Sequence, residues 1–268
     1  MPIVTLTSDL NTKDYYLAAV KAAVYSQIPD VKWVDISNHI PPFDMAKAAF
    51  VLKNVWKEFP EGTIHIVGVA SDWSRETPYA IVKVKGQYFI GTDNGFFSLL
   101  FPEDIEVEWI RNLKLNGDED LSFPTKSIFV SAAAKIAGKE ELDTFTVEVE
   151  GYKRRPLPIP VVEPDNLRGM AIYIDSYGNV ITNITRDLFE REVGSKPFNI
   201  VVRRGDADLN KISRTYNEVP QGEKVALFTE EGFLEIAINH GVEGSGGGAA
   251  DLLGLRENDI IRVEILEG

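Results

Sequence analysis

The chain of 268 residues contains no cysteine. Disulfide bonds, thiolate catalysis and cysteine-ligated zinc or iron–sulfur sites are therefore excluded. Histidine is scarce as well, and His39, His65 and His240 show none of the short spacings typical of metal ligands. No G-x-S-x-G motif is present, which disfavours a Ser–His–Asp hydrolase. We therefore expect no metal site, and we expect His65, inside a predicted strand, to be structural.

Positive charge is under-represented, with 28 Lys and Arg against 41 Asp and Glu and a formal net charge of −13. Such a chain repels nucleic-acid phosphates and anionic membrane surfaces. No apolar run approaches the roughly 20 residues that span a bilayer. The N-terminus lacks the basic and apolar regions of a signal peptide. We expect a cytoplasmic protein that binds a small molecule rather than nucleic acid or membrane.

Strand and helix signals alternate over residues 1–154. Short β-rich runs alternate with helical stripes, and a hairpin is predicted to turn at Lys85-Gly86. The predicted strands are 3–7, 31–36, 63–69, 79–84 and 87–90, and the predicted helices begin near Tyr16, after the N-cap Asp44 and at Ile128. This order predicts an α/β domain, layered as α/β/α around an at least partly parallel sheet.

The pattern changes near Arg155. Four prolines between Pro156 and Pro164 predict an extended linker over 155–166. Beyond it the predicted strands are short and bounded by turns, namely 170–174, 180–184, 198–202, 224–228, 233–238 and 260–265. We therefore predict a second, all-β domain over 167–268 that is barrel-like.

Two polar segments stand at strand ends in the first domain. Asp9 follows the first predicted strand, and α/β sheets bind ligands at the carboxyl ends of their strands. Its carboxylate could accept hydrogen bonds from both hydroxyls of a ribose diol. A helix-capping or turn role is the alternative for Asp9. Asp93-Asn94-Gly95 follows a later strand, and on its own this sequence favours a simple turn.

In the second domain, the segment 175–179 suits a hairpin turn between two strands. Thr182 and Asn183 are polar within the next strand, which indicates either a polar ligand or satisfied core amides. The glycine-rich run 244–248 lacks the Lys-Ser/Thr ending of a phosphate-binding loop, so a surface loop is favoured there.

Several runs, in order along the chain, resemble the S-adenosyl-L-methionine (SAM) hydroxide adenosyltransferases and the related fluorinases and chlorinases. They are 5–9 with 12–14, 34–37, 40–44, 59–65, 93–95, 175–184 and 232–239. The resemblance implies an α/β/α domain, a β-barrel and a homotrimer. It also implies that SAM binds where the first domain of one subunit meets the second domain of its neighbour.

The same resemblance implies roles for single residues. Asp9 would hold the ribose hydroxyls, and Phe43 would pack against ribose or adenine. Asn179 and the backbone around Asn239 would read the adenine edge, while Asp175 would lie near the methionine amino group. SAM would be the substrate, and no further cofactor is implied.

Three more residues complete the predicted substrate-binding set. Asp93 and Asn94 belong to a motif that matches the family. The resemblance therefore favours a binding role for them over a simple turn. Phe123 falls where halogenase relatives keep an aromatic residue. All three are therefore expected to line the substrate site.

The chain departs from the family where water is activated. Family hydrolases use an Asp, an Arg and a His, but Ala70 takes the Asp position and Pro124 the His position. Asp72 and Arg75 are the predicted replacements for the Asp and the Arg. Thr125 could match a small hydroxyl residue of the halogenases, and it completes the predicted catalytic set.

Three functions are compatible with these residues. The first is an enzyme that converts SAM and water to adenosine and methionine. The second is a SAM- or adenosine-binding protein that has lost the chemistry, which Ala70 and Pro124 favour. The third is a halide adenosyltransferase of the chlorinase type. A SAM methyltransferase is disfavoured, since no glycine-rich loop follows the first strand.

Overall fold

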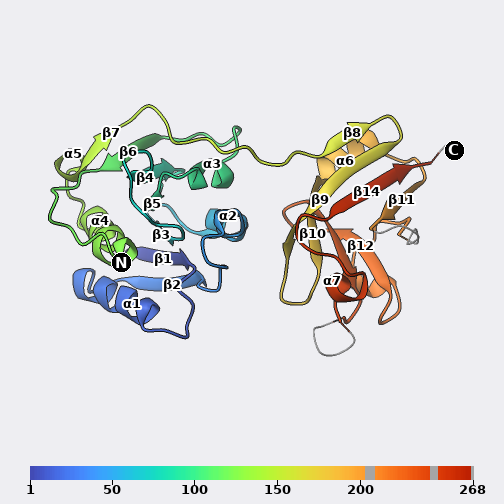
Figure 1. Cartoon of the computed structure of the whole chain (residues 1–268), viewed down its shortest axis with the longest axis horizontal. Coiled ribbons are helices and arrows are strands. Elements are labelled where there is room, and N and C mark those ends of the chain that lie inside the picture. Colours follow the sequence, from blue (N-terminus) through green and yellow to red (C-terminus); the bar gives the residue numbers. More distant parts are fainter. Residues whose placement is uncertain (203–208, 242–246, 267–268) are drawn as a thin grey trace. The chain divides into compact units, whose positions relative to one another are not determined.

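The computed structural model describes residues 1–202, 209–241 and 247–266. The chain divides into two compact units, Met1–Pro156 and Leu157–Gly268 (Figure 1). Within the described ranges, every helix is too short or too polar to cross a membrane.

The first unit is built on a mixed seven-stranded sheet with the order β2-β1-β3-β5-β4-β6-β7. Its strands are β1 (Ile3–Ser8), β2 (Lys32–Ser37), β3 (Ile64–Gly68), β4 (Tyr79–Val84), β5 (Gln87–Thr92), β6 (Trp109–Leu113) and β7 (Thr146–Glu148). β2, β1, β3 and β5 pair in parallel, and the remaining pairs are antiparallel. The α/β prediction is confirmed, and the carboxyl ends of β1, β3 and β5 meet at one edge.

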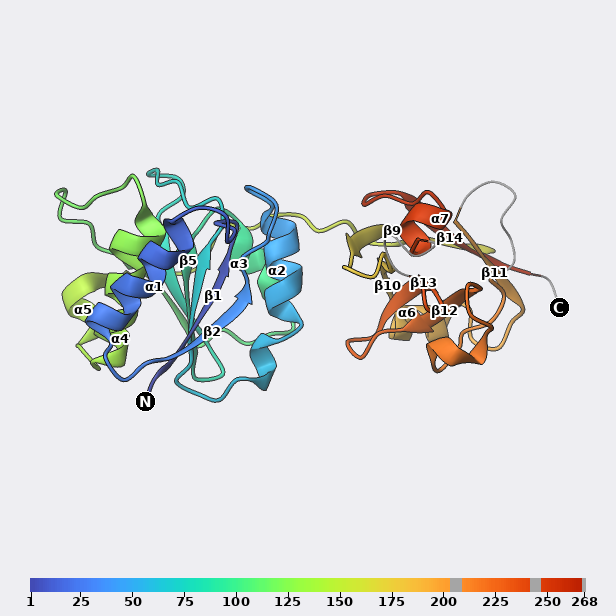
Figure 2. The same cartoon turned by 90° about the horizontal axis from the view of Figure 1, so that it is seen from below.

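Helices pack on this sheet around two clusters of buried side chains. They are α1 (Tyr16–Gln27), α2 (Met45–Lys53), η1 (Trp56–Glu58), α3 (Phe96–Leu100), η2 (Thr125–Phe129), α4 (Val130–Ala137) and α5 (Leu142–Phe145). One cluster joins α1 and α4 to the sheet, and the other joins α2 and α3 to it. Figure 2 shows α1 and α4 on one side of the strands and α2 and α3 on the other.

Local sequence explains two of the predicted boundaries. Lys85 and Gly86 have φ of 47° and 69°, which is the left-handed pair that a tight hairpin between β4 and β5 needs. The Asp44 side chain accepts from the Lys47 N–H over 2.9 Å and caps α2. α2 ends at Lys53, and buried Trp56 belongs to the following η1.

The second unit is a curled antiparallel sheet with the order β11-β14-β9-β10-β13-β12, and β8 pairs with β9. Its strands are β8 (Val161–Glu163), β9 (Asn166–Ile174), β10 (Val180–Thr185), β11 (Phe198–Val201), β12 (Lys224–Phe228), β13 (Phe233–Ile238) and β14 (Ile260–Ile265). Short helices α6 (Arg186–Glu192), η3 (Tyr216–Glu218) and α7 (Ala249–Leu252) accompany them. The β-rich prediction is confirmed, while β8 lies inside the segment predicted as linker.

The curl brings the two end strands toward each other. Leu209 forms a single bridge with Ile200 of β11, and Ile212 forms one with Ala226 of β12. One short segment therefore links both ends of the sheet around a shared apolar core. This arrangement gives the unit its barrel-like character.

Candidate functional site

Asp9 lies directly after β1, at the edge where the parallel strands end. Its Oδ2 accepts a hydrogen bond from the Phe43 N–H over 2.9 Å. Its own N–H reaches the Gly68 carbonyl at the end of β3, 3.5 Å away. Burial raises the pKa of the Asp9 carboxyl, and backbone hydrogen bonds from Phe43 and Ala70 partly offset that rise.

Phe43 and Ala70, whose backbones lower the pKa of Asp9, adopt a conformation that side chains disfavour. Phe43 has φ of 65° and Ala70 has φ of 47°, in the left-handed region. The Phe43 ring is also 70% exposed, which is unusual for a large aromatic side chain. Backbone strain of this kind clusters at functional sites, so Asp9, Phe43 and Ala70 form the first candidate centre.

Two of the predicted catalytic residues lie on the loop between β3 and β4. Asp72 and Arg75 are both exposed there. The Asp72 charge contributes to the raised pKa of Asp9, so the two carboxylates lie near each other. Burial, with a further contribution from Asp72, raises the pKa of Tyr79 to about 12. The structure thus brings Asp72 close to Asp9 and leaves Arg75 facing solvent.

Thr125, which is far from Asp9 in the sequence, lies at the same edge of the sheet. It is buried at the start of η2, a π turn that Pro124 precedes, and π turns often occur at functional sites. Its hydroxyl and methyl lie only 2.7 Å from where a Cβ on Gly68 would stand. Phe123 packs edge-on against Tyr16, with ring centroids 5.4 Å apart. Gly68 therefore connects Thr125 to the Asp9 centre.

Asp93 and Asn94 use their side chains to support the surrounding loops. Asp93 Oδ1 accepts from the Lys153 N–H over 2.8 Å. Asn94 Nδ2 donates to the Ala70 carbonyl over 2.9 Å, and Asn94 Oδ1 accepts from the Phe96 N–H over 3.2 Å. Asn94 thereby steadies the residue whose backbone lowers the pKa of Asp9. Direct contacts of Asp93 and Asn94 with substrate stay predictions.

The second unit carries a cavity of about 380 Å³ that includes both predicted adenine readers. It is lined by Tyr177, Asn179, Tyr216, Asn217, Ile238, Asn239, His240 and Gly241. Aromatic and apolar walls with a few amides at the rim are what a flat purine requires. The cavity is the second candidate centre.

Asp175 holds the turn that carries Asn179. Its Oδ1 accepts from the N–H groups of Tyr177 and Asn179, both over 2.9 Å, and its Oδ2 accepts from Asn179 Nδ2 over 3.0 Å. Asn239 Nδ2 donates to the Val219 carbonyl over 2.7 Å. The backbone N–H and carbonyl of Asn239 also pair within the unit. Asp175 is thus used structurally, and its place at the methionine end stays a prediction.

Two further sequence features make contacts within the second unit. The partly buried Asn183 is satisfied within the protein, since its Oδ1 accepts from the Met170 N–H over 2.8 Å and its Nδ2 donates to the Pro158 carbonyl over 3.0 Å. The glycine-rich run lies outside the described residues over 242–246. At its described end, Gly248 packs so tightly on the turn that a Cβ would lie 2.3 Å from the Tyr177 carbonyl.

Sequence reasoning missed a pair formed by a tyrosine of the cavity wall and a buried glutamate. The Tyr216 hydroxyl donates to Glu235 Oε1 over 2.8 Å, and Glu235 is only 5% exposed. Burial raises the pKa of Glu235, the Tyr216 hydrogen bond lowers it, and the nearby Asp175 charge raises it further. The sequence offered one signal for this pair, namely a glutamate between the apolar residues of β13. Nothing in the sequence marked Tyr216, at the start of η3, as its partner.

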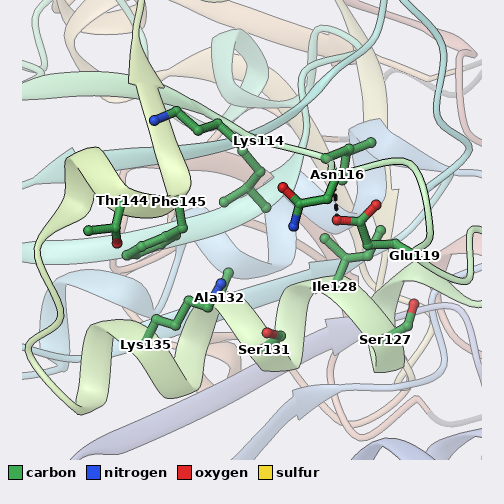
Figure 3. Close-up of a pocket in the computed structure, with 12 residues that line it drawn as sticks. Lys114, Asn116, Glu119, Ser127, Ile128, Ser131, Ala132, Lys135, Thr144 and Phe145 are labelled. Atoms are coloured by element: carbon green, nitrogen blue, oxygen red, sulfur yellow. Dashed lines mark hydrogen bonds between the residues drawn. The ribbon is translucent and has the colours of Figure 1, made fainter.

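A smaller cavity of about 100 Å³ lies apart from both centres. Ser131 and Lys135 of α4 line one side of it, and Lys114 and Asn116 line the other (Figure 3). The Asn116 N–H donates to Glu119 Oε1 over 2.7 Å at its rim. None of the predicted site residues lines this cavity.

The fold and the two centres define a class of protein with a strained carboxylate centre in an α/β unit and a cavity lined by two tyrosines in a β unit. Comparison with known families names it. Residues 4–146 match the SAM hydroxide adenosyltransferase N-terminal domain, and residues 169–262 match the C-terminal domain. The chain belongs to the SAM hydroxide adenosyltransferase family.

Individual relatives agree with that membership. The chain is 28% identical over 266 residues to the (R)-S-adenosyl-L-methionine hydrolase of Thermus thermophilus, covering 96% of this chain and 97% of the relative. It is 24% identical to the fluorinase of an Actinoplanes species, covering 89% and 91%. A crystal structure of an uncharacterized conserved protein from Thermotoga maritima superposes with a TM-score of 0.84 at 26% identity, covering 98% and 99%.

Proposed function

We propose that this protein cleaves SAM at the ribose 5′ carbon with water, giving adenosine and methionine. The oxygen of water forms a bond to the 5′ carbon while the carbon–sulfur bond breaks. The electron pair of that bond goes to the sulfonium sulfur, which leaves as the neutral thioether of methionine. One proton of the water passes to a base. Family membership and the hydrolases among the relatives support this reaction.

The observation that carries the proposal is the geometry of Asp9. A carboxylate offers about four lone-pair positions, and the Phe43 N–H donates to Oδ2 over 2.9 Å. The carboxylate can therefore accept further hydrogen bonds from the hydroxyls of a ribose. The exposed Phe43 ring would cover the sugar or the base. SAM is also a cation at sulfur, so the neighbouring carboxylates of Asp9 and Asp72 would attract it.

Asp72 is the proposed base for the water proton. It would take the role of the family's Asp. Ala70, two residues before Asp72, occupies the position of that Asp. Arg75, on the same loop, is proposed to close over the bound substrate and balance this carboxylate. Thr125 is proposed to position the nucleophile, because it lies at the same edge of the sheet as Asp9.

Adenine is proposed to occupy the cavity in the second unit. Asn179 and Asn239 would bond the ring edge, and the tyrosine rings of the cavity would cover its faces. The proposal includes the homotrimer that the family resemblance implies, in which two neighbouring copies contribute to one SAM site. Phe123, Asp93, Asn94 and Asp175 are proposed to shape the remainder of that site.

The test is incubation of the purified protein with SAM while adenosine is followed by chromatography. We expect adenosine from the wild type and from Asp30→Ala, an exposed carboxylate just before β2. We expect none from Asp9→Ala. Failure of the wild type to form adenosine would overturn the proposal.

The same experiment addresses the competing functions. Ala70 and Pro124 in place of the family's Asp and His favour a binding protein without chemistry. Saturable binding of SAM or adenosine without turnover would establish that alternative. A chlorinated nucleoside that forms only when chloride is added would establish a halide adenosyltransferase.

A further inference from the structure

Three buried hydroxyl groups in the described part of the chain have no hydrogen-bond partner in the protein. They belong to Thr7, Tyr79 and Thr92, which are at most 3% exposed. Buried polar groups nearly always bond to something, and ordered water is the usual partner when no protein group is available. Each of these hydroxyls therefore needs a partner from outside the protein chain, such as an ordered water.

Tyr79 and Thr92 stand directly opposite each other. Tyr79 begins β4, Thr92 ends β5, and the two residues pair in the antiparallel register. Opposed residues share one face of a sheet, with Cβ atoms about 5 Å apart. Tyr79 packs there with Ile81 and Ile90 in the cluster beneath α1 and α4.

Thr125 lies in the same row. The parallel register aligns Ile66 of β3 with Ile90 of β5. Two residues beyond that pair, β3 ends at Gly68 and β5 ends at Thr92. Gly68 has no side chain, and the Thr125 hydroxyl fills the space above it. η2 contacts both β3 and β5. The hydroxyls of Tyr79, Thr92 and Thr125 thus share one face at the edge that carries Asp9.

Thr7 lies on the opposite face of the sheet. It pairs in register with Val67, which belongs to the cluster under α2 and α3. Its hydroxyl is as buried as the other two, and it also lacks a protein partner. Thr7 therefore provides a matched internal control.

We propose that Tyr79 and Thr92 are positioning residues that hold the attacking water between their hydroxyls, beside Thr125. The inference rests on the proposed function and deepens it, because it supplies water binding where Ala70 and Pro124 leave the family's groups missing. Each hydroxyl donates one hydrogen bond and accepts up to two, so the pair can fix the orientation of one water. That water gives its oxygen to the 5′ carbon and one proton to Asp72.

The charge near Tyr79 agrees with this role. Burial, with the Asp72 charge, keeps the pKa of the Tyr79 phenol at about 12, so the phenol stays protonated at neutral pH. A neutral phenol can donate to the water oxygen without competing for its proton. The Asp72 charge contributes to this raised pKa, so the proposed base and the phenol interact electrostatically.

The test removes single hydroxyls with little change of shape. We expect Tyr79→Phe and Thr92→Val each to lower kcat about ten- to a hundredfold while KM for SAM stays within about twofold. The double variant should lose little more than either single variant, because one water serves both groups. Thr92→Ser keeps a hydroxyl and should restore most of kcat, and Thr7→Val should leave kcat unchanged. Unchanged kcat in Tyr79→Phe and Thr92→Val would overturn the inference.

A second measurement does not depend on turnover. If the wild type makes no adenosine, the proposed function fails. A water shared by Tyr79 and Thr92 would still make the effects of the two substitutions on Tm non-additive. We expect the Tm change of the double variant to differ from the sum of the single changes by about 2–4 °C. The pair Thr7→Val and Tyr79→Phe should be additive. Additive changes for Tyr79→Phe and Thr92→Val would also overturn the inference.

Discussion

The backbone N–H of Phe43 donates to Asp9 Oδ2 over 2.9 Å while φ of Phe43 is 65°. The bond joins the end of β1 to the loop after β2, 34 residues away. The backbone of Ala70, in the loop after β3, also lowers the pKa of the Asp9 carboxyl. One carboxylate thus organises three loops, and substitutions there should change both stability and substrate binding.

Asp9→Asn should make the first unit more stable at neutral pH while it abolishes adenosine formation. Burial raises the folded-state pKa of Asp9 above the unfolded value of 3.8, so ionisation lowers stability as pH rises through that folded-state pKa. Asn keeps one oxygen that can accept the Phe43 N–H, and it carries no charge. We expect Tm at pH 7 to rise by about 1–3 °C, and the gain to vanish below about pH 4. A lower Tm at pH 7 would show that the carboxylate stabilises the fold.

Phe43→Gly and Phe43→Ala should separate backbone strain from the contribution of the ring. Both variants lose the aromatic ring, so both should weaken SAM binding to a similar extent, by about tenfold. Only Gly adopts the left-handed conformation of residue 43 without strain. The free energy of unfolding of Phe43→Gly should therefore be about 1 kcal/mol higher than that of Phe43→Ala. Calorimetry measures both quantities. Normal SAM affinity in both variants would remove Phe43 from the proposed site.

The fold was largely predictable because its strands and turns are local in sequence. The hairpin at Lys85-Gly86 and the cap at Asp44 use short-range chemistry, and both are present. Asp9 was found for a similar reason, since the carboxyl end of a strand is a general ligand position.

The rest of the site depends on contacts between distant residues. Gly68 and Thr125 meet only in the folded sheet, and so do Tyr216 and Glu235. The polar turn Asp93-Asn94 illustrates the converse problem. Its side chains bond to Lys153, Ala70 and Phe96, so a structural use and a binding use look alike in sequence.

His65 should make the first unit sensitive to mild acid. It bonds to Thr5 Oγ1 over 2.8 Å and to Gln87 Oε1 over 2.7 Å, and burial lowers its pKa from 6.5 to about 4. The folded state thus favours neutral histidine. Its contribution is complete above pH 6.5 and is lost as pH falls toward 4, by up to about 3 kcal/mol.

His65→Gln is the variant that tests this pH dependence, because it removes the titrating ring and keeps polar atoms. The free energy of unfolding should be measured by urea denaturation between pH 7 and pH 4. The wild type should lose more stability over that range than the variant does. Parallel curves would mean that His65 is not the group responsible.

Tyr216 should serve both the fold and the proposed adenine pocket, through different atoms. Tyr216→Phe keeps the ring and removes the hydroxyl that donates to buried Glu235, which should cost about 1–3 kcal/mol of stability. Adenosine affinity should fall little in that variant. Tyr216→Ala removes the ring as well and should weaken adenosine binding about tenfold or more. Equal affinity in Phe and Ala variants would exclude stacking on Tyr216.

Gly68→Ala should displace Thr125, because the new Cβ would stand 2.7 Å from its hydroxyl and its methyl. We expect this variant to lose about 1–3 kcal/mol of stability and most of its adenosine formation. Thr125→Ala removes both crowded atoms, so Gly68→Ala combined with Thr125→Ala should be more stable than Gly68→Ala alone. The double variant should nevertheless stay inactive, since it lacks the Thr125 hydroxyl, whereas Thr125→Ser in the wild-type background should keep activity. Full activity in Thr125→Ala would show that Thr125 only fills space above Gly68.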